Sequence, residues 1–151
     1  MNKLNLVSAW SEWLVADTNG FFITLNTPVI DHILFESHLR SIAHKLNDYC
    51  YGRSYKRKEK CLKIIAGIEN GKINDGLHSH IIVTHIGDIK RTLQEVNAFI
   101  RKHWYRMINR VGIFGSMVDV QKLGDINTRF TYVTKDTGYL MRSGNFNIVA
   151  L

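Results

Sequence analysis

The sequence predicts an α+β fold, built on a central antiparallel sheet of the ferredoxin-like, split-βαβ type. Three observations predict it. Short runs rich in aromatic and β-branched residues alternate with two long stretches that carry apolar residues at helical spacing. Two of the runs are separated only by residues 70–76, whose Asn-Gly and Asp-Gly pairs predict a turn. The resulting order is β-α-β-β-α-β, followed by an appended helix that could lie across the uncovered face of the sheet.

The first half of the chain predicts two helices with a strand between them. Apolar residues within 4–15 have the spacing of a short N-terminal helix. Residues 17–20, Asp-Thr-Asn-Gly, indicate a turn, and the aromatic and β-branched run at 21–26 indicates a strand. Residues 30–49 then carry apolar side chains every three or four positions, as on one face of a helix.

The second half predicts the rest of the sheet. The apolar runs 62–69 and 77–84 flank the predicted turn, and we expect them to pair as an antiparallel hairpin. Residues 89–110 have the periodicity of a long amphipathic helix. The remaining elements are a strand, a helix that Asp125 could cap, and a short edge strand, at 117–122, 125–135 and 146–151.

Size and composition favour one globular domain that spans residues 1–151. The chain is 45% hydrophobic and 11% aromatic, which fits a packed core and excludes a disordered chain. No repeat, low-complexity stretch or Pro/Gly/Ser-rich linker divides it. The net charge of +7 and the pI of about 9.5 favour an anionic partner, such as nucleic acid or an acidic membrane surface.

Two features concern the cellular compartment. The cysteines, Cys50 and Cys61, form no CxxC pair, and we expect both to be free thiols in a reducing compartment. Residues 1–17 lack the apolar stretch of a signal peptide, and no run approaches the roughly 18–20 apolar residues that span a bilayer. We therefore expect a soluble, intracellular protein.

A pair of histidines lies in one of the predicted strands. His78 and His80 are two positions apart, so their side chains point to the same face and present two imidazole nitrogens to one metal ion. A hydrogen-bonded pair without metal is the alternative. If the hairpin pairs Glu69 with His78, a carboxylate joins that face, whereas a shift of one residue would place it on the other. Such ligands suit Mg²⁺, Mn²⁺ or another first-row divalent ion, which can polarise a phosphate.

A tyrosine and a lysine share one face of the helix predicted at 125–135. Tyr132 and Lys135 are about one turn apart, which places a nucleophile beside a cation. Phenols ionise only near about pH 10 and need such help for covalent chemistry at neutral pH. A packing tyrosine followed by a solvated lysine is the alternative. Tyr139 is a second-choice nucleophile, because Gly138 can end the helix before it.

Basic residues gather after the first long helix. The segment 51–60 interleaves two tyrosines with five cations, which are Arg53, Lys56, Arg57, Lys58 and Lys60. Cations of this kind can follow phosphates while aromatic rings stack on bases. A second basic set lies on the helix predicted at 89–110 and consists of Arg101, Lys102, Arg106 and Arg110. A solvated charged surface is the alternative for each set. Combined with a site that handles phosphate, the two sets favour DNA as the partner.

Three motifs occur in a fixed order along the chain. They are Phe-Ile-Thr-Leu-Asn at 22–26, Leu-His-Ser-His at 77–80 and Tyr-Val-Thr-Lys-Asp at 132–136. The set resembles the HUH endonuclease superfamily, specifically the rolling-circle replication initiators (Rep proteins) of plasmids and single-stranded DNA viruses. The second motif is similar to the His-hydrophobe-His motif of that family, and the third to its Tyr-x-x-Lys motif. Ser79 departs from the family, which usually has a bulky hydrophobic residue there, but its side chain should face away from the metal.

The resemblance implies that residues 1–151 form a single nuclease domain with the HUH fold. A helicase domain is common in viral relatives, but we expect none within these residues. It implies that Tyr132, assisted by Lys135, attacks single-stranded DNA or a melted origin hairpin and becomes linked to the 5′ phosphate. His78, His80 and Glu69 would hold Mg²⁺ or Mn²⁺. The strand could later be rejoined without ATP. The expected setting is the cytoplasm of a bacterial or archaeal host, with no membrane partner, and a homodimer is compatible with it.

Two alternatives remain open at this point. A single-tyrosine transposase of the same superfamily would join transposon-end DNA in place of origin DNA. A non-catalytic ferredoxin-like module would bind nucleic acid through stacking aromatic residues and would not need a divalent ion. Substrate choice in a joining assay separates the first alternative, and a divalent-ion titration separates the second.

Overall fold

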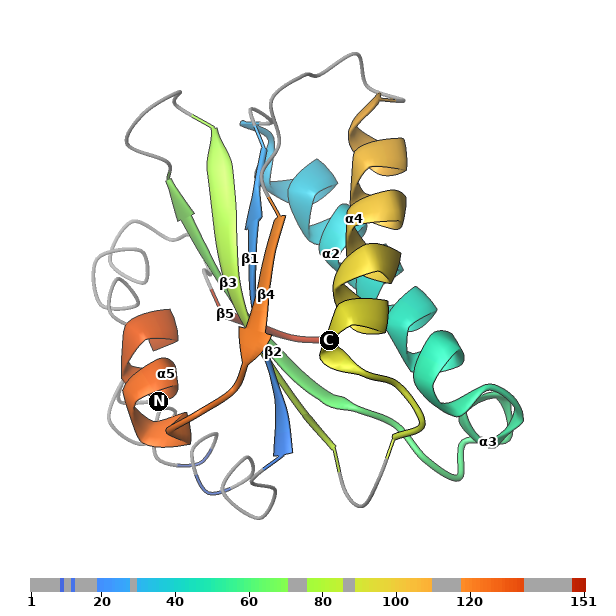
Figure 1. Cartoon of the computed structure of the whole chain (residues 1–151). Coiled ribbons are helices and arrows are strands. Elements are labelled where there is room, and N and C mark those ends of the chain that lie inside the picture. The colour runs from blue at the N-terminus through green and yellow to red at the C-terminus, as the bar shows by residue number, and fades with distance from the viewer. Residues whose placement is uncertain are drawn as a thin grey trace.

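The computed structural model describes residues 9, 12, 19–27, 30–70, 76–85, 89–109, 118–134 and 148–151. The predicted N-terminal helix at 4–15 falls almost wholly outside these ranges. The described elements follow the order expected from the sequence, with one short helix, α3, in addition (Figure 1). They are β1 (Asn19–Asn26), α2 (His32–Tyr51), α3 (Arg53–Lys56), β2 (Lys63–Asn70), β3 (Leu77–His85), α4 (Leu93–Asn109), β4 (Val118–Lys122), α5 (Ile126–Thr134) and β5 (Ile148–Ala150).

The described strands form one antiparallel sheet, and the predicted α+β class is confirmed. The strand order is β4-β1-β3-β2-β5. β3 pairs with β1 on one side and with β2 on the other, along nearly its whole length. The expected edge strand near the C-terminus is β5, which pairs with β2. β3 is therefore the central strand of the sheet.

Helices cover both faces of the sheet (Figure 1). α2 and α4 lie on one face, and α5 lies on the other. Alternating side chains divide the core between the faces, so that Phe21 and Ile23 of β1 join the larger core with α2 and α4. The smaller core, called the α5 core below, contains Phe22, Ile65, Ile82, Leu123, Phe130 and Val133. No described helix combines the length and the apolar character needed to cross a bilayer.

Side chains that bind backbone amides fix where α4 and α5 begin. Before α4, Thr92 and Glu95 form a capping box, in which each side chain accepts a hydrogen bond from the other residue's amide, at 3.2 and 2.8 Å. Before α5, the Asp125 carboxylate accepts from the hydroxyl and, at 3.0 Å, from the amide of Thr128. These bonds hold the pKa of the Asp125 carboxyl below its ordinary value. The predicted cap of α5 is thus confirmed.

Candidate metal centre

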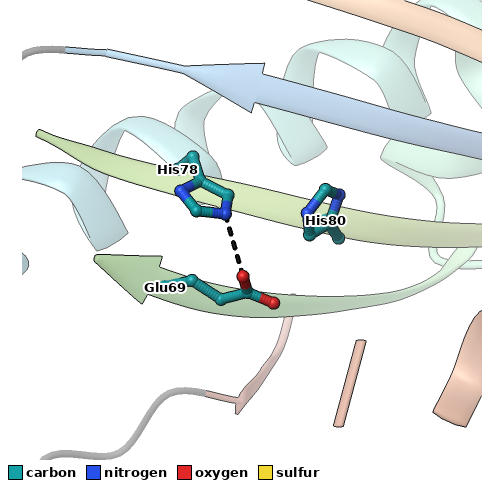
Figure 2. A group of neighbouring side chains, drawn as sticks. All are labelled: Glu69, His78 and His80. Carbon is teal, nitrogen blue, oxygen red and sulfur yellow. Dashed lines mark hydrogen bonds and ion pairs between the residues drawn. The ribbon is translucent and has the colours of Figure 1, made fainter. Parts of the chain in front are cut away.

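The β2–β3 hairpin brings a carboxylate and two imidazoles together, as Figure 2 shows. Its register pairs Glu69 with His78, which is the condition under which the sequence places the carboxylate on the histidine face. His78 and His80 have the parity of Ile82, which lies in the α5 core, so they face α5. We call Glu69, His78 and His80 the metal cluster.

The dimensions of the metal cluster suit a metal ion. One nitrogen or oxygen atom from each side chain lies within 4.8 Å of the others. His78 Nε2 lies 2.9 Å from Glu69 Oε2. Adjacent ligands of an octahedral ion with bonds of about 2.1 Å are about 3.0 Å apart, so this pair already has the required spacing. Two imidazole nitrogens and one carboxylate oxygen also form a donor set that first-row divalent ions accept.

Burial differs across the metal cluster. Glu69 is 4% exposed and His80 is 8% exposed, whereas the His78 side chain is 20% exposed. Burying a polar group without a partner costs about 1–3 kcal/mol, so the contact between Glu69 and His78 stabilises the carboxylate inside the protein. The cluster is therefore mostly enclosed, and solvent reaches it at His78.

Two residues of β1 orient the His80 ring. Thr24 pairs with His80 across the sheet, and its Oγ1 lies 3.1 Å from His80 Nδ1. The Phe22 ring stacks on the imidazole with a centroid distance of 5.7 Å and an interplanar angle of 7°. Metal-binding histidines commonly have their second ring nitrogen held in this way, which fixes both the tautomer and the ring direction. With Nδ1 held by Thr24, Nε2 is the His80 nitrogen that could bind an ion.

α5 brings Tyr132 against the metal cluster. The Tyr132 and His80 ring centroids are 4.7 Å apart at an angle of 72°. The neighbouring residues Phe130 and Val133 are buried in the α5 core and hold the helix against the sheet. Tyr132 itself is 45% exposed. A phenol that is accessible to solvent thus lies in contact with one of the metal-cluster imidazoles.

A glycine in β2 permits this close packing of α5. A Cβ atom at Gly67 would lie 2.5 Å from the Val133 carbonyl oxygen and 3.0 Å from Val133 Cγ1. Any larger residue would therefore push α5 away from the sheet. Gly67 pairs with His80 across the hairpin, so the close approach occurs beside the metal cluster.

Arg129 is a neighbour of the site that sequence reasoning missed. Its guanidinium carbon lies 4.3 Å from the centre of the Phe22 ring. Its Nη2 donates to Gln121 Oε1 at 2.9 Å, and its Nε donates to the Leu123 carbonyl at 3.3 Å. Arg129 precedes Tyr132 by three residues and shares its face of the helix. That spacing was the signal that could have identified it.

The predicted DNA-binding segment lies away from the metal cluster. Its five cations, Arg53, Lys56, Arg57, Lys58 and Lys60, are all exposed. They belong to α3 and to the residues between α3 and β2, and α3 packs against α2. β2 begins at Lys63, and Glu69 follows six residues later, about 20 Å further along an extended strand. The structure does not bring these cations and the metal cluster together.

Of three other predicted residues, the structure describes only Ser79. Ser79 is fully buried, and its hydroxyl donates to the Gly67 carbonyl oxygen at 2.9 Å. Its side chain lies on the face of β3 that contributes to the larger core, so it points away from the metal cluster as expected. Lys135 and Tyr139 lie outside the described residues. Their roles, like that of Tyr132, stay predictions.

Comparison with protein-family models, with curated proteins and with solved structures finds no match to this chain. The function must therefore be inferred from the site itself, above all from the spacing within the metal cluster and the contact of Tyr132 with His80.

Proposed function

We propose that this chain is a metal-dependent endonuclease and strand transferase of the HUH superfamily, which nicks a replication origin and initiates rolling-circle replication. The observation that carries the proposal is the 4.7 Å contact between the rings of Tyr132 and His80, a member of the metal cluster. A nucleophile and a Lewis-acid site within reach of one phosphate are what covalent phosphodiester transfer needs.

The topology supports the same family. The order β4-β1-β3-β2 with antiparallel pairing, and with α2 and α4 as the connecting helices, agrees with the split-βαβ arrangement. The paired histidines lie on the central strand β3, and the tyrosine lies on a helix that follows the last strand of this unit. This is the placement that the resemblance to Rep proteins implies.

In the proposed reaction, one phosphate ester is exchanged for another. The Tyr132 oxygen forms a bond to the phosphorus of a DNA phosphodiester, while the bond from that phosphorus to the 3′ oxygen breaks. The phenol loses its proton to solvent, and the departing 3′ oxygen gains one. The downstream strand stays linked to Tyr132 through its 5′ phosphate. A later 3′-OH can reverse the exchange, so no ATP is required.

The residues around Tyr132 have different roles in the proposed reaction. The metal cluster would hold Mg²⁺ or Mn²⁺, which when bound supplies a Lewis acid that polarises the scissile phosphate. Thr24 keeps the His80 ring oriented. Arg129 adds a cation on the helix face of the nucleophile, where it attracts the DNA backbone. Lys135, outside the described residues, is predicted to stabilise the phenolate or the phosphate charge.

The predicted DNA-binding segment, residues 51–60, has a role away from the scissile phosphate in this proposal. The segment precedes Lys63, which begins β2 about 20 Å along the strand from Glu69. We therefore assign it to DNA that flanks the scissile phosphate. Contacts of exposed cations with phosphates are electrostatic and independent of sequence. They would raise the affinity for the origin DNA but would not determine the position of the nick.

The test is a covalent-linkage assay with a pool of single-stranded oligonucleotides, Mn²⁺ and a denaturing gel. We expect a label at the 3′ end of the DNA to migrate with the protein, because the downstream fragment carries the linked 5′ phosphate. A 5′ label should appear on a shorter, free strand whose 3′-OH a polymerase can extend. Chelation of the divalent ion should abolish both products.

Single substitutions test the proposed nucleophile and the proposed metal ligands separately. Tyr132→Phe should abolish the linked product, while Tyr105→Phe, at an exposed tyrosine of α4, is the matched control and should retain it. His78→Ala and His80→Ala should each remove the metal-dependent product. An active Tyr132→Phe protein would refute the assignment, and loss with Tyr139→Phe alone would move it to that residue. DNA binding without linkage and without any need for a divalent ion would indicate a binding module.

A further inference from the structure

A second group of cations lies on the side of the sheet opposite to the metal cluster. Lys102, His103 and Arg106 lie within about one turn of α4, and α2, which packs against α4, carries Lys45, whose charge acts on the His103 ring. We call these four residues the helix-face cluster. Burial, and then the charges of the three cations, lower the pKa of the His103 imidazole. The three cations themselves are exposed. At neutral pH the cluster therefore presents three positive charges around an uncharged ring.

A stack of side chains ends at this cluster. The Arg91 guanidinium lies 4.0 Å from the centre of the Tyr49 ring. Tyr49 and Phe99 stack at 4.1 Å and 12°, and Phe99 and His103 lie 4.3 Å apart at 49°. Two groups that are each about 4 Å from one ring must occupy its opposite faces. Tyr49 and Phe99 are therefore covered on both sides, which leaves no open face for a nucleobase.

The two ends of the stack differ in charge balance. At one end, Glu95 Oε1 lies 3.8 Å from Arg91 Nη1. At the other end, no carboxylate of the described residues lies within 4.0 Å of the charged nitrogens of the three helix-face cations. Like charges held together repel one another, so an anion from outside the chain would stabilise this arrangement.

We propose that the helix-face cluster binds the phosphate backbone of double-stranded nucleic acid. Cations without carboxylate partners suit phosphates, whereas single strands are held largely through aromatic faces that are open to bases. Here the aromatic faces are closed, which favours a duplex over a single strand. Because the cluster and Tyr132 lie on opposite faces of the sheet, a duplex on α2 and α4 does not compete with DNA at Tyr132. The proposal rests on these side chains and does not require metal-dependent cleavage.

The test compares two double variants that remove the same charge. Lys45→Gln with Lys102→Gln alters the helix-face cluster. Arg40→Gln with Lys122→Gln is the control, because Arg40 is already paired with Glu36 at 2.7 Å and Lys122 lies on β4. Binding of a labelled DNA duplex is measured by anisotropy over a range of salt concentrations, without divalent ions. Each lost phosphate contact should make the slope of log affinity against log salt less negative by about 0.9, so we expect a change of about 1.8 in the first variant only.

Duplex RNA and lipid vesicles test whether the helix-face cluster binds a ligand other than duplex DNA. Duplex RNA replaces duplex DNA in a second series, and a similar slope change there would extend the proposal to RNA helices. Equal slope changes in both double variants would overturn it, because only net charge would then matter. Loss of binding to phosphatidylserine vesicles with unchanged duplex binding would assign the surface to a membrane and overturn it too. Both double variants should retain covalent linkage to a short single strand. If neither the wild-type protein nor the variants form this linkage, the nuclease proposal is refuted and the duplex-binding proposal is not.

Discussion

Replacing Gly67 by alanine should move Tyr132, the proposed nucleophile, without altering any proposed metal ligand. The new Cβ would lie 2.5 Å from the Val133 carbonyl oxygen, whereas such atoms ordinarily approach to about 3.3 Å. α5 must therefore shift by about 0.8 Å. Overpacking of this kind costs about 1–3 kcal/mol, of which alanine recovers about 0.5–1 kcal/mol through its better backbone propensity. We expect a net loss of about 0–2.5 kcal/mol in the free energy of unfolding.

The effect on activity should exceed the effect on stability. A misplacement near 1 Å can lower a rate by about 10²-fold, so we expect single-turnover linkage to slow by about 10- to 100-fold. The affinity for Mn²⁺, measured by calorimetry, should stay unchanged because the metal cluster lies on β2 and β3. Ile64→Val is the matched control, since it costs about 0.5–1.5 kcal/mol in the larger core and does not touch α5. A Gly67→Ala protein with the linkage rate of this control would refute the close-packing explanation.

Three further predictions concern single side chains. Thr24→Val removes the hydroxyl at His80 Nδ1 and should weaken Mn²⁺ binding by about 10- to 100-fold in calorimetry; an unchanged affinity would contradict the orienting role. Burial raises the pKa of the Cys50 thiol to about 11, so at pH 8 iodoacetamide should modify the exposed Cys61 first, as peptide mass spectrometry would show. Asp125→Ala should lower Tm at neutral pH. Because hydrogen bonds depress the pKa of Asp125, the difference from wild type should shrink only as the pH falls below about 4, and a difference that persists at pH 2 would exclude this cause.

Much of the fold follows from patterns that are local in the sequence. β3 was expected at 77–84 and is observed at Leu77–His85, and α5 was expected at 125–135 and is observed at Ile126–Thr134. Alternation along a strand depends only on neighbouring residues, and it correctly places His78 and His80 on one face and Ser79 on the other.

The site depends on relations that no local pattern contains. The register that pairs Glu69 with His78 is set by the packing of the whole hairpin, and a shift of one residue would have been equally compatible with the sequence. The contact of Tyr132 with His80 requires the absence of a side chain at Gly67, which carries no signal in a strand pattern. The separation of the basic segment from the metal cluster likewise follows from the direction of β2.

The unequal size of the two cores has a consequence for the local opening of α5. His78 and His80 lie on β3, which is hydrogen-bonded on both sides, whereas α5 is held by the few apolar residues of the α5 core. Segments with fewer buried contacts open at lower free energy than the central strands of a sheet. Amide hydrogens of α5 should accordingly exchange with solvent faster than those of β3. In the proposed reaction, opening of α5 would carry the DNA strand linked to Tyr132 away from the sheet, while the imidazoles of β3 stay in place for the next strand.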